Sequence, residues 1–222
     1  LTSSALLLDV KGAFDNVSKV RLLESMTRMR IPKALVEWVS SFMSDRLIAL
    51  AFDGSKEELQ PVNTGIPQGS PCSPILFLIY LKPLFDELER HKLNIQTPSY
   101  IDDVAIMVTG KSTVKNAATL QKAAAIAFEW ARQNAIAFDD SKSELIHFAN
   151  SNKVPTCSMV LPNGTELHPL PSVRWLGILL DRKLSFRPHV ENRIAAAGRA
   201  LSSLLRLSTT EKGLTLSNMR QL

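Results

Sequence analysis

Short apolar runs that end at polar or turn-forming residues recur along the chain, and their periods predict its first elements. The run Ala5–Val10 is apolar except for Asp9, a pattern typical of a buried central strand with the acid at its exit. Apolar positions at helical spacing predict a helix over 17–30 and a second over 32–43, with Pro32 in its first turn. The segments 47–52 and 58–63, on either side of Asp53-Gly54, predict a hairpin.

The loop from Thr64 to Pro74 contains two glycines and three prolines, which predict a stiff segment open to close approach. Ser73 is the expected N-cap of the next helix, with Pro74 at its first helical position. That helix should run to about Glu89. It is apolar nearly all round up to Phe85, so we expect it to be a buried central helix.

The remaining pattern predicts an Ala-rich helix over 112–134, a turn and strand over 136–149, a hairpin around Asn163-Gly164, a strand over 173–180 and a final helix over 188–207. Strands and helices follow one another without a regular βαβ alternation. This order predicts an α+β fold in which helices cover one face of an antiparallel sheet.

The stretch from Ser99 to Val108 carries the first chemical signal. Asp102 and Asp103 lie between two short apolar, β-branched runs, which predicts a hairpin with the acids at its tip. Adjacent carboxylates repel each other, and a hard divalent cation would remove that repulsion. One hypothesis is therefore a two-metal site for phosphoryl chemistry. The other is a solvated turn, because Asp is a common turn former.

Composition narrows the class of protein. The 222 residues are 45% hydrophobic and carry a formal charge of +5, which suits a globular chain with a polyanionic partner but does not require one. The longest apolar run, Ile75–Leu81, is too short to span a membrane. Cys72 and Cys157 form no disulfide framework or metal spacing, which predicts a reduced intracellular setting.

Several motifs occur in an order that resembles the reverse transcriptase palm. They are Leu7-Leu8-Asp9-Val10 with Ala13-Phe14-Asp15, Gly65-Ile66-Pro67-Gln68-Gly69-Ser70, Tyr100-Ile101-Asp102-Asp103, Lys142 after a turn, and Trp175-Leu176-Gly177-Ile178 with Asp181-Arg182-Lys183-Leu184. The last motif, followed by His189 and a helix, looks most like the reverse transcriptases of non-LTR retrotransposons. The resemblance extends from about Leu6 to Leu207.

The resemblance implies a catalytic set of carboxylates. Asp9, Asp102 and Asp103 match the family's catalytic acids, with the Val10 carbonyl as a further metal ligand. The implied cofactor is a pair of Mg²⁺ ions, with Mn²⁺ as a substitute, which would stabilise the attacking 3′-oxygen and the leaving pyrophosphate. The competing interpretation of Asp9 is an acid at the surface end of a strand.

The nucleotide site is also implied by the resemblance. Phe14, beside Ala13, matches a bulky gate below the sugar that selects deoxynucleotides, although a lone Phe is more often a core residue. Gln68 and Gly69 would lie against the incoming nucleotide, or else form a plain loop before a helix. Lys142 matches a lysine suggested to donate a proton to pyrophosphate, with a solvated surface lysine as the alternative.

Four aromatic or turn residues are implied to bind the primer. Trp175, Leu176 and Gly177 resemble the primer grip, a hairpin that holds the primer's 3′ end; a buried core Trp is the competing interpretation. Tyr100, just before the acids, would pack near the primer end, or is simply a hairpin aromatic.

The domain layout and partners follow from the same resemblance. Residues 1–186 would form the palm, with a small fingers portion near 17–63, and residues 187–222 would begin an incomplete thumb. Both ends look cut, so we expect a piece of a longer protein whose fingers and endonuclease regions lie elsewhere. The parent would use an RNA template, a DNA primer and dNTPs, and would act in the nucleus.

Alternatives remain at this stage. The chain could be a catalytically inactive palm that binds nucleic acid, left by a truncated element. Intact Asp9, Asp102 and Asp103 argue against such decay. An RNA-templated RNA polymerase is disfavoured by Phe14, since ribonucleotide polymerases need room for the 2′-hydroxyl. Group II intron and retron enzymes share the Asp pair, but the residues from Leu176 to His189 favour the retrotransposon branch.

Overall fold

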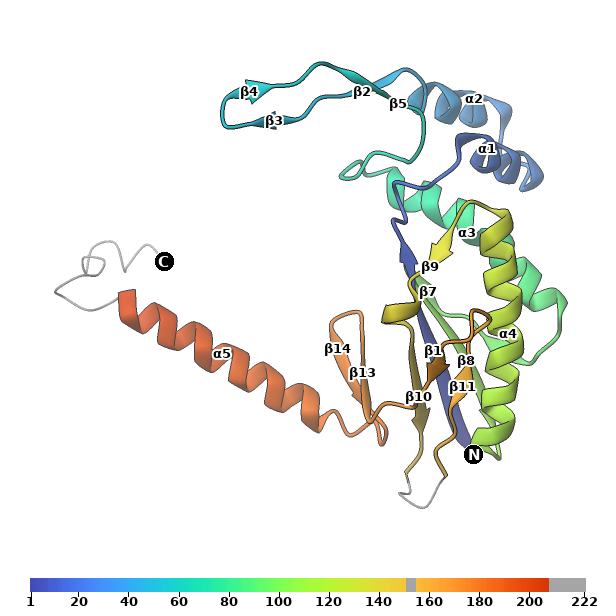
Figure 1. Ribbon diagram of the computed structural model, residues 1–222, viewed down its shortest axis with the longest axis vertical. Coiled ribbons are helices and arrows are strands. Elements are labelled where there is room, and N and C mark those ends of the chain that lie inside the picture. Colours follow the sequence, from blue (N-terminus) through green and yellow to red (C-terminus); the bar gives the residue numbers. More distant parts are fainter. Residues whose placement is uncertain (151–154, 208–222) are drawn as a thin grey trace. The chain divides into compact units, whose positions relative to one another are not determined.

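A computed structural model describes residues 1–150 and 155–207 of the chain, with side chains described up to residue 204 (Figure 1). The chain divides into two compact units, Leu1–Leu170 and the segment from Pro171 onward. The assignment of palm to residues 1–186 and thumb to 187–222 stays a prediction.

The first unit is built on an antiparallel sheet, which confirms the predicted fold class. The sheet has the order β10 (Glu144–Phe148), β1 (Thr2–Lys11), β8 (Asp103–Gly110) and β6 (Ile95–Gln96). Two short strands complete it: β7 (Ser99–Tyr100) pairs with β8, and β9 (Ala137–Phe138) pairs with β1. The residues from Ala5 to Leu8 in the middle of β1 are all buried, which explains the apolar run there, because successive side chains of a central strand project to two covered faces.

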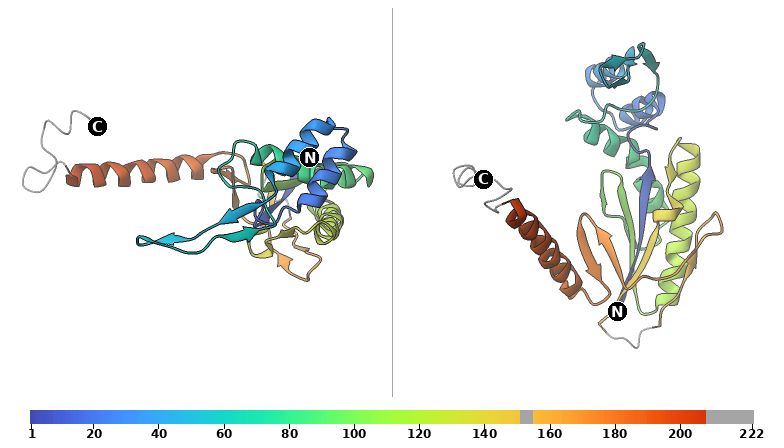
Figure 2. Two further views of the ribbon diagram at one scale, coloured as in Figure 1. Left: turned by 90° about the horizontal axis from the view of Figure 1, so that it is seen from above. Right: turned by 60° about the vertical axis from the view of Figure 1, so that its left-hand side comes forward.

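Helices pack on this sheet to form the core. Helix α4 (Thr113–Gln133) lies along β8 and β1, as Figure 1 and the right view of Figure 2 show. Helix α3 (Ser73–Arg90) packs against α4 and α1 (Lys19–Arg28). Leu6, Ile106 and Leu120 are completely buried in the shared core. Burial of each such side chain contributes about 1.5–3 kcal/mol, and these contacts therefore fix the sheet that carries the aspartates.

Helix α3 differs from its prediction in two ways. Ser73 is the first residue inside the helix rather than its N-cap, and its hydroxyl donates to the Pro67 carbonyl at 2.6 Å. The helix is also not buried all round, since Ile75 is 61% exposed and Leu78 is 43% exposed. Its buried face is the stripe that includes Phe77 and Leu81, so apolar sequence alone overstated its burial.

A buried polar network ties α4 to the sheet. Ser4 on β1 and His147 on β10 share a 2.7 Å hydrogen bond between Oγ and Nδ1. Asn116 on α4 donates to Ser4 Oγ at 3.1 Å and to the Thr2 carbonyl at 2.9 Å. The Nε2 atom of His147 lies 2.8 Å from the Cys157 carbonyl, which can only accept. In a neutral ring, Nε2 would donate to that carbonyl and Nδ1 would accept from the Ser4 hydroxyl.

The remaining elements of the first unit are short. Helix α2 (Lys33–Phe42) begins directly after Pro32, which is its N-cap and not a residue of its first turn. The hairpin predicted over 47–63 exists, but it is broken into two pairs, β2 (Arg46–Ile48) with β5 (Gln60–Val62) and β3 (Ala51–Phe52) with β4 (Ser55–Lys56). The 3-10 helix η1 (Asp140–Lys142) precedes β10, and the strands β11 (Met159–Val160) and β12 (Glu166–Leu167) form the hairpin predicted around Asn163-Gly164.

The second unit contains a hairpin followed by helix α5 (Arg187–Leu207). The single strand predicted over 173–180 is wrong. It is two strands, β13 (Ser172–Trp175) and β14 (Ile178–Asp181), joined at Leu176 and Gly177, whose φ angles are 48° and 80°. A tight hairpin turn with two positive φ values interrupts the apolar run. Among the described residues, no helix is long and apolar enough to cross a membrane.

Candidate active site

Asp9 and Asp103 are neighbours across two strands. They are directly paired in the antiparallel register of β1 and β8, which begins at Thr2↔Gly110 and ends at Asp9↔Asp103. Residues paired in this way project to the same face of a sheet with Cβ atoms about 4.5–5.5 Å apart. The apolar core that fixes this register therefore also brings the two carboxylates together.

Asp102 lies in the turn between β7 and β8, as predicted. Its carbonyl accepts a 3.3 Å hydrogen bond from the Val10 amide, which ties the turn to the end of β1. The preceding residue, Ile101, has a φ of 55°, and a β-branched residue in this region is strained. The turn holds this conformation because its neighbours on β1 and β8 fix both of its ends.

The carboxylates influence one another electrostatically. Partial burial, followed by the negative charges of Asp102 and Asp9, raises the pKa of the Asp103 carboxyl above its ordinary value. Crowded like charges disfavour ionisation, and a nearby cation would reverse that effect. The three acids predicted as catalytic thus share one electrostatic site.

Lys142 supplies a cation to this site. Its Nζ atom donates to Asp9 Oδ2 at 2.9 Å and lies 3.8 Å from Asp139 Oδ2. The hydrogen bond and charge of Asp9 raise the pKa of the Lys142 ammonium above its ordinary value. The backbone amide of Asp139 also donates to the Asp9 carbonyl at 2.9 Å, so the η1 segment is fixed beside β1. The sequence motif placed Lys142 near the nucleotide but gave no sign of this ion pair.

The donor set fits a divalent cation chemically. In the part of the chain that the structure describes, no group of three His, Cys, Asp or Glu side chains is already arranged to hold a metal ion. The carboxylates of Asp9, Asp102 and Asp103 are nonetheless the oxygen ligands that hard cations prefer. Their mutual repulsion at Asp103, and the cationic group already held by Asp9, show that this site favours positive charge.

The loop that contains Gln68 is attached to the turn after β1. The Gly65 amide donates to the Val17 carbonyl at 2.9 Å, and the Ile66 amide donates to the Phe14 carbonyl at 2.7 Å. Gly65 has a φ of 76°, and a Cβ there would lie 2.8 Å from the Phe14 carbonyl oxygen. Glycine is therefore required at this position by both conformation and space.

Gln68 itself is exposed and donates through Nε2 to Asp15 Oδ1 at 3.0 Å. Gly69 is also exposed, with a φ of 88° and open space where a Cβ would be. Gln68 lines a pocket of about 620 Å³, together with Asp15 and Arg46, and Gly69 is the next residue along the chain. The structure thus connects this loop to the Phe14-Asp15 turn.

Arg46 is a residue that sequence reasoning missed. Its guanidinium donates from Nη2 to the Thr64 carbonyl at 2.6 Å and to the Gly65 carbonyl at 2.7 Å, while its buried Nε atom has no partner. It therefore fixes the start of the Gln68 loop and lines the same pocket. No short motif marks this arginine, because its two acceptors are backbone atoms from a distant turn.

Phe14 and Ala13 lie close to the core. The Phe14 ring is half-buried and packs against Phe77 with a centroid separation of 5.5 Å, while Ala13 is only 6% exposed. Part of the Phe14 ring therefore remains accessible. A role below a sugar stays a prediction, and the contact with Phe77 gives the ring a structural role as well.

The residues predicted to bind a primer lie in both units. Tyr100 belongs to β7, beside the acids, and is 58% exposed. Trp175 ends β13 in the second unit, where it pairs with Ile178 across the turn formed by Leu176 and Gly177. Leu176 is 46% exposed and Trp175 is half-buried.

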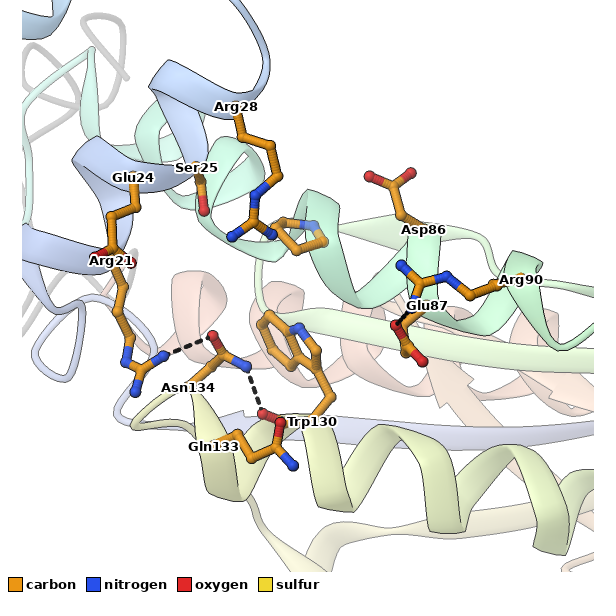
Figure 3. Close-up of a pocket in the computed structure, with 11 residues that line it drawn as sticks. Arg21, Glu24, Ser25, Arg28, Asp86, Glu87, Arg90, Trp130, Gln133 and Asn134 are labelled. Carbon is orange, nitrogen blue, oxygen red and sulfur yellow. Dashed lines mark hydrogen bonds and ion pairs between the residues drawn. The ribbon is translucent and has the colours of Figure 1, made fainter.

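A separate pocket of about 370 Å³ lies among α1, α3 and α4 (Figure 3). Arg21 reaches across it and donates to Asn134 Oδ1 at 3.2 Å, and Arg90 pairs with Glu87 at 2.7 Å. Arg28 points into the same space, above the Trp130 indole. The lining combines basic and acidic side chains, and none of the catalytic or binding residues predicted from the sequence contributes to it.

Comparisons with known proteins identify relatives of the chain. Residues 2–180 match a family model described as reverse transcriptase (RNA-dependent DNA polymerase). The RNA-directed DNA polymerase from the mobile element jockey of Drosophila melanogaster is 30% identical over 83% of this chain and 20% of its own length. A probable RNA-directed DNA polymerase from transposon X-element of the same organism is 29% identical over 94% of this chain and 24% of its own length.

Solved structures support the fold. Apo telomerase from Candida tropicalis, truncated from its C-terminal domain, matches 81% of this chain and 34% of its own with a TM-score of 0.58 and 12% identity. Telomerase from Candida albicans with a fragment of telomeric RNA gives the same TM-score at 11% identity, over 81% of this chain and 29% of its own. The chain spans about a fifth to a quarter of the first curated relatives above.

Proposed function

Because the chain belongs to the reverse transcriptase family and is related to the enzymes of non-LTR retrotransposons, we propose that it provides the catalytic centre of an RNA-directed DNA polymerase. The reaction would add dNTPs to the 3′ end of a DNA primer on an RNA template. It would serve the copying of the parent element, which we place in the nucleus.

The pairing of Asp9 with Asp103 is the observation that carries this proposal. Two acids from separate strands, with Asp102 in the adjoining turn, concentrate negative charge at one end of the sheet. A fold gains no stability from like charges placed directly opposite each other. Their presence at the position of the family motif is therefore best explained by chemistry that needs a carboxylate cluster.

Asp9, Asp102, Asp103 and the Val10 carbonyl would hold the two Mg²⁺ ions. When bound, such ions lower the barrier by stabilising charge on the attacking and leaving oxygens. Gln68 and Gly69, on the loop fixed by Arg46, would contact the nucleotide, with Ala13 and Phe14 beneath its sugar. Lys142 would offer a proton near the leaving group. Tyr100, Trp175, Leu176 and Gly177 would support the primer.

Primer extension tests this function. The assay uses a polypeptide that contains this chain together with the flanking regions of its parent, an RNA template, a DNA primer and Mg²⁺. Loss of a metal ligand removes several kcal/mol of transition-state stabilisation, so Asp103→Asn should lower dNTP incorporation by at least about 100-fold. The matched variant Asp86→Asn, an exposed acid on α3, should retain activity.

The outcomes separate the proposal from the inactive alternative. Activity that persists in Asp103→Asn would refute the assigned site. A wild-type polypeptide that binds the template–primer in a salt-dependent manner but never extends it would instead support a nucleic-acid-binding remnant, because phosphate contacts release counterions whether or not chemistry follows.

A further inference from the structure

The ion pair between Lys142 and Asp9 engages the same carboxylate that would bind metal in the proposed function. The 2.9 Å contact places the ammonium on an oxygen of the carboxylate that would bind metal. The ammonium takes up part of the capacity of Oδ2 and adds positive charge beside the position that a divalent cation would occupy. The two cations must therefore compete for Asp9.

Asp139 provides a second position for the same ammonium. Its Oδ2 atom lies 3.8 Å from Lys142 Nζ, and its Oδ1 atom accepts from the Ser141 hydroxyl at 2.6 Å and from the Ser141 amide at 3.1 Å. These bonds hold the Asp139 carboxylate in place independently of Lys142. Asp9 on β1 and Asp139 at the N-cap of η1 thus offer two anionic partners to one flexible side chain.

We propose that Lys142 acts as a displaceable cation that occupies Asp9 before a divalent ion binds and then transfers its ammonium to Asp139. This inference rests on the proposed function, because it describes the state of the proposed metal site before a divalent ion binds. Lys142 is a positioning residue in this role. It limits the repulsion among the acids before metal binding and gives up Asp9 when metal arrives.

The exposure of the partners makes the displacement feasible. The Lys142 side chain is 62% exposed and that of Asp9 is 27% exposed, so the ammonium is largely solvated and the carboxylate partly so. Exposed pairs contribute little, and breaking this one should weaken metal binding by only about three- to fivefold. A divalent ion that gains several oxygen ligands can overcome that difference, whereas a buried pair would block the site.

Mn²⁺ titration of the 222-residue chain, followed by electron paramagnetic resonance, tests this competition. Lys142→Met removes the ammonium but keeps a side chain of similar length, and it should tighten Mn²⁺ binding by about three- to fivefold. Lys11→Met is the matched control. Lys11 is exposed, follows Asp9 on β1 and makes no side-chain ion pair among the described residues, so its loss should change the affinity much less.

A double-mutant cycle tests the transfer to Asp139. Asp139→Asn should weaken Mn²⁺ binding in the wild-type background, because the displaced ammonium then has no second partner. In the Lys142→Met background the same change should have a smaller effect, since no ammonium needs a new position. Coupling between the two changes is the expected signature, whereas purely additive effects would overturn the transfer step.

The remaining outcomes are distinct. This inference would be overturned if Lys142→Met bound Mn²⁺ no more tightly than the wild type. The proposed function would stand in that case, provided that Asp103→Asn still lost Mn²⁺ binding. Mn²⁺ binding that no variant of Asp9 or Asp103 affects would refute the metal site and the inference together. Equal tightening in Lys11→Met and Lys142→Met would show a general charge effect and would overturn the role of the ion pair.

Discussion

Asp9 and Asp103 lie directly opposite each other on the hydrogen-bonded strands β1 and β8. A like-charge pair in this position opposes folding by roughly 0.2–1 kcal/mol relative to neutral residues. The apolar residues of the same two strands supply much larger contributions of the opposite sign. The sheet can therefore hold a locally unfavourable arrangement, which is a common property of functional sites.

Gly65 should be far less replaceable than Gly69. Both have positive φ, but a Cβ at Gly65 would lie 2.8 Å from two backbone carbonyl oxygens, whereas Gly69 has open space. Gly65→Ala should lower the free energy of unfolding by roughly 2–4 kcal/mol, and Gly69→Ala by about 1–2 kcal/mol from conformation alone. Urea denaturation measures both. Equal effects would contradict the proposed attachment of this loop to the turn at Phe14.

The buried network around Ser4 should contribute measurably to stability. Ser4→Ala removes the hydrogen bond between Ser4 and His147 and one acceptor of Asn116, so it should cost about 1–3 kcal/mol of unfolding free energy. Ser3→Ala is the control, because its hydroxyl bond to Thr109 is exposed and should be worth much less. A chemical denaturation experiment that finds the two variants equally stable would rule out this account of the network.

Phe14 should influence both substrate choice and stability. Phe14→Val would open the space below a nucleotide sugar and should raise ribonucleotide incorporation relative to dNTPs by about tenfold or more in the primer-extension assay, which corresponds to at least about 1.4 kcal/mol. The lost contact with Phe77 should also lower stability by about 1–3 kcal/mol.

The control for Phe14 is Phe77→Leu. Phe77 is completely buried, so this change should destabilise the fold without altering the choice between ribo- and deoxynucleotides. If Phe14→Val discriminates between ribonucleotides and dNTPs as the wild type does, Phe14 is only a core residue, which is the competing interpretation of the sequence.

Asp181 should make the start of α5 sensitive to acid. Burial acts to raise the pKa of its carboxyl, but hydrogen bonds from Ser185, Phe186 and Lys183 outweigh burial and hold the pKa below its ordinary value. A depressed pKa in the folded state means that the stabilisation is complete above the ordinary Asp value of about 3.9 and is lost as pH falls through the folded pKa.

Hydrogen exchange at the Phe186 amide measures this effect. Near neutral pH, Asp181→Asn should reduce protection of that amide about fivefold, which corresponds to roughly 1 kcal/mol. The difference from wild type should shrink as pH falls below about 4 and disappear once pH has passed below the depressed pKa of the folded carboxyl, where the wild-type side chain is also neutral. Amides of β10 should be unaffected. A difference that stays constant down to the lowest pH would contradict the role of ionised Asp181.

Much of the fold follows from local pattern. The apolar run of β1, the periodicity of α4 between Ser112 and Asn134, and the acids at the tip of the β7–β8 hairpin all lie where periodicity and turn chemistry predict them. These elements are long or are bounded by clear capping and turn residues, so local preference and tertiary packing agree. The register that pairs Asp9 with Asp103 does not follow from the pattern, because Ala5 to Leu8 are buried on both faces of β1 and a shifted pairing would also bury apolar residues.

Other features depend on contacts that no local pattern contains. The apolar pattern over 173–180 does not show the turn at Leu176, because a non-glycine residue with positive φ has no distinct signal within an apolar run. Only the resemblance of Trp175, Leu176 and Gly177 to a primer-grip hairpin implies a turn there. Arg46 was missed because it binds backbone carbonyls, which every residue possesses. The pair of Lys142 with Asp9 joins residues that are distant in sequence, and only the packing of η1 beside β1 brings them together.

The most direct test of the central claim is the affinity of the chain for Mn²⁺ in the wild type and in Asp103→Asn. Removal of one carboxylate from a shared oxygen site should weaken binding by at least about tenfold, because it takes away both a ligand and a charge. Asp86→Asn should bind as the wild type does. If Asp103→Asn retains wild-type affinity, Asp9 and Asp103 do not form a metal site, and the proposed catalytic centre is wrong.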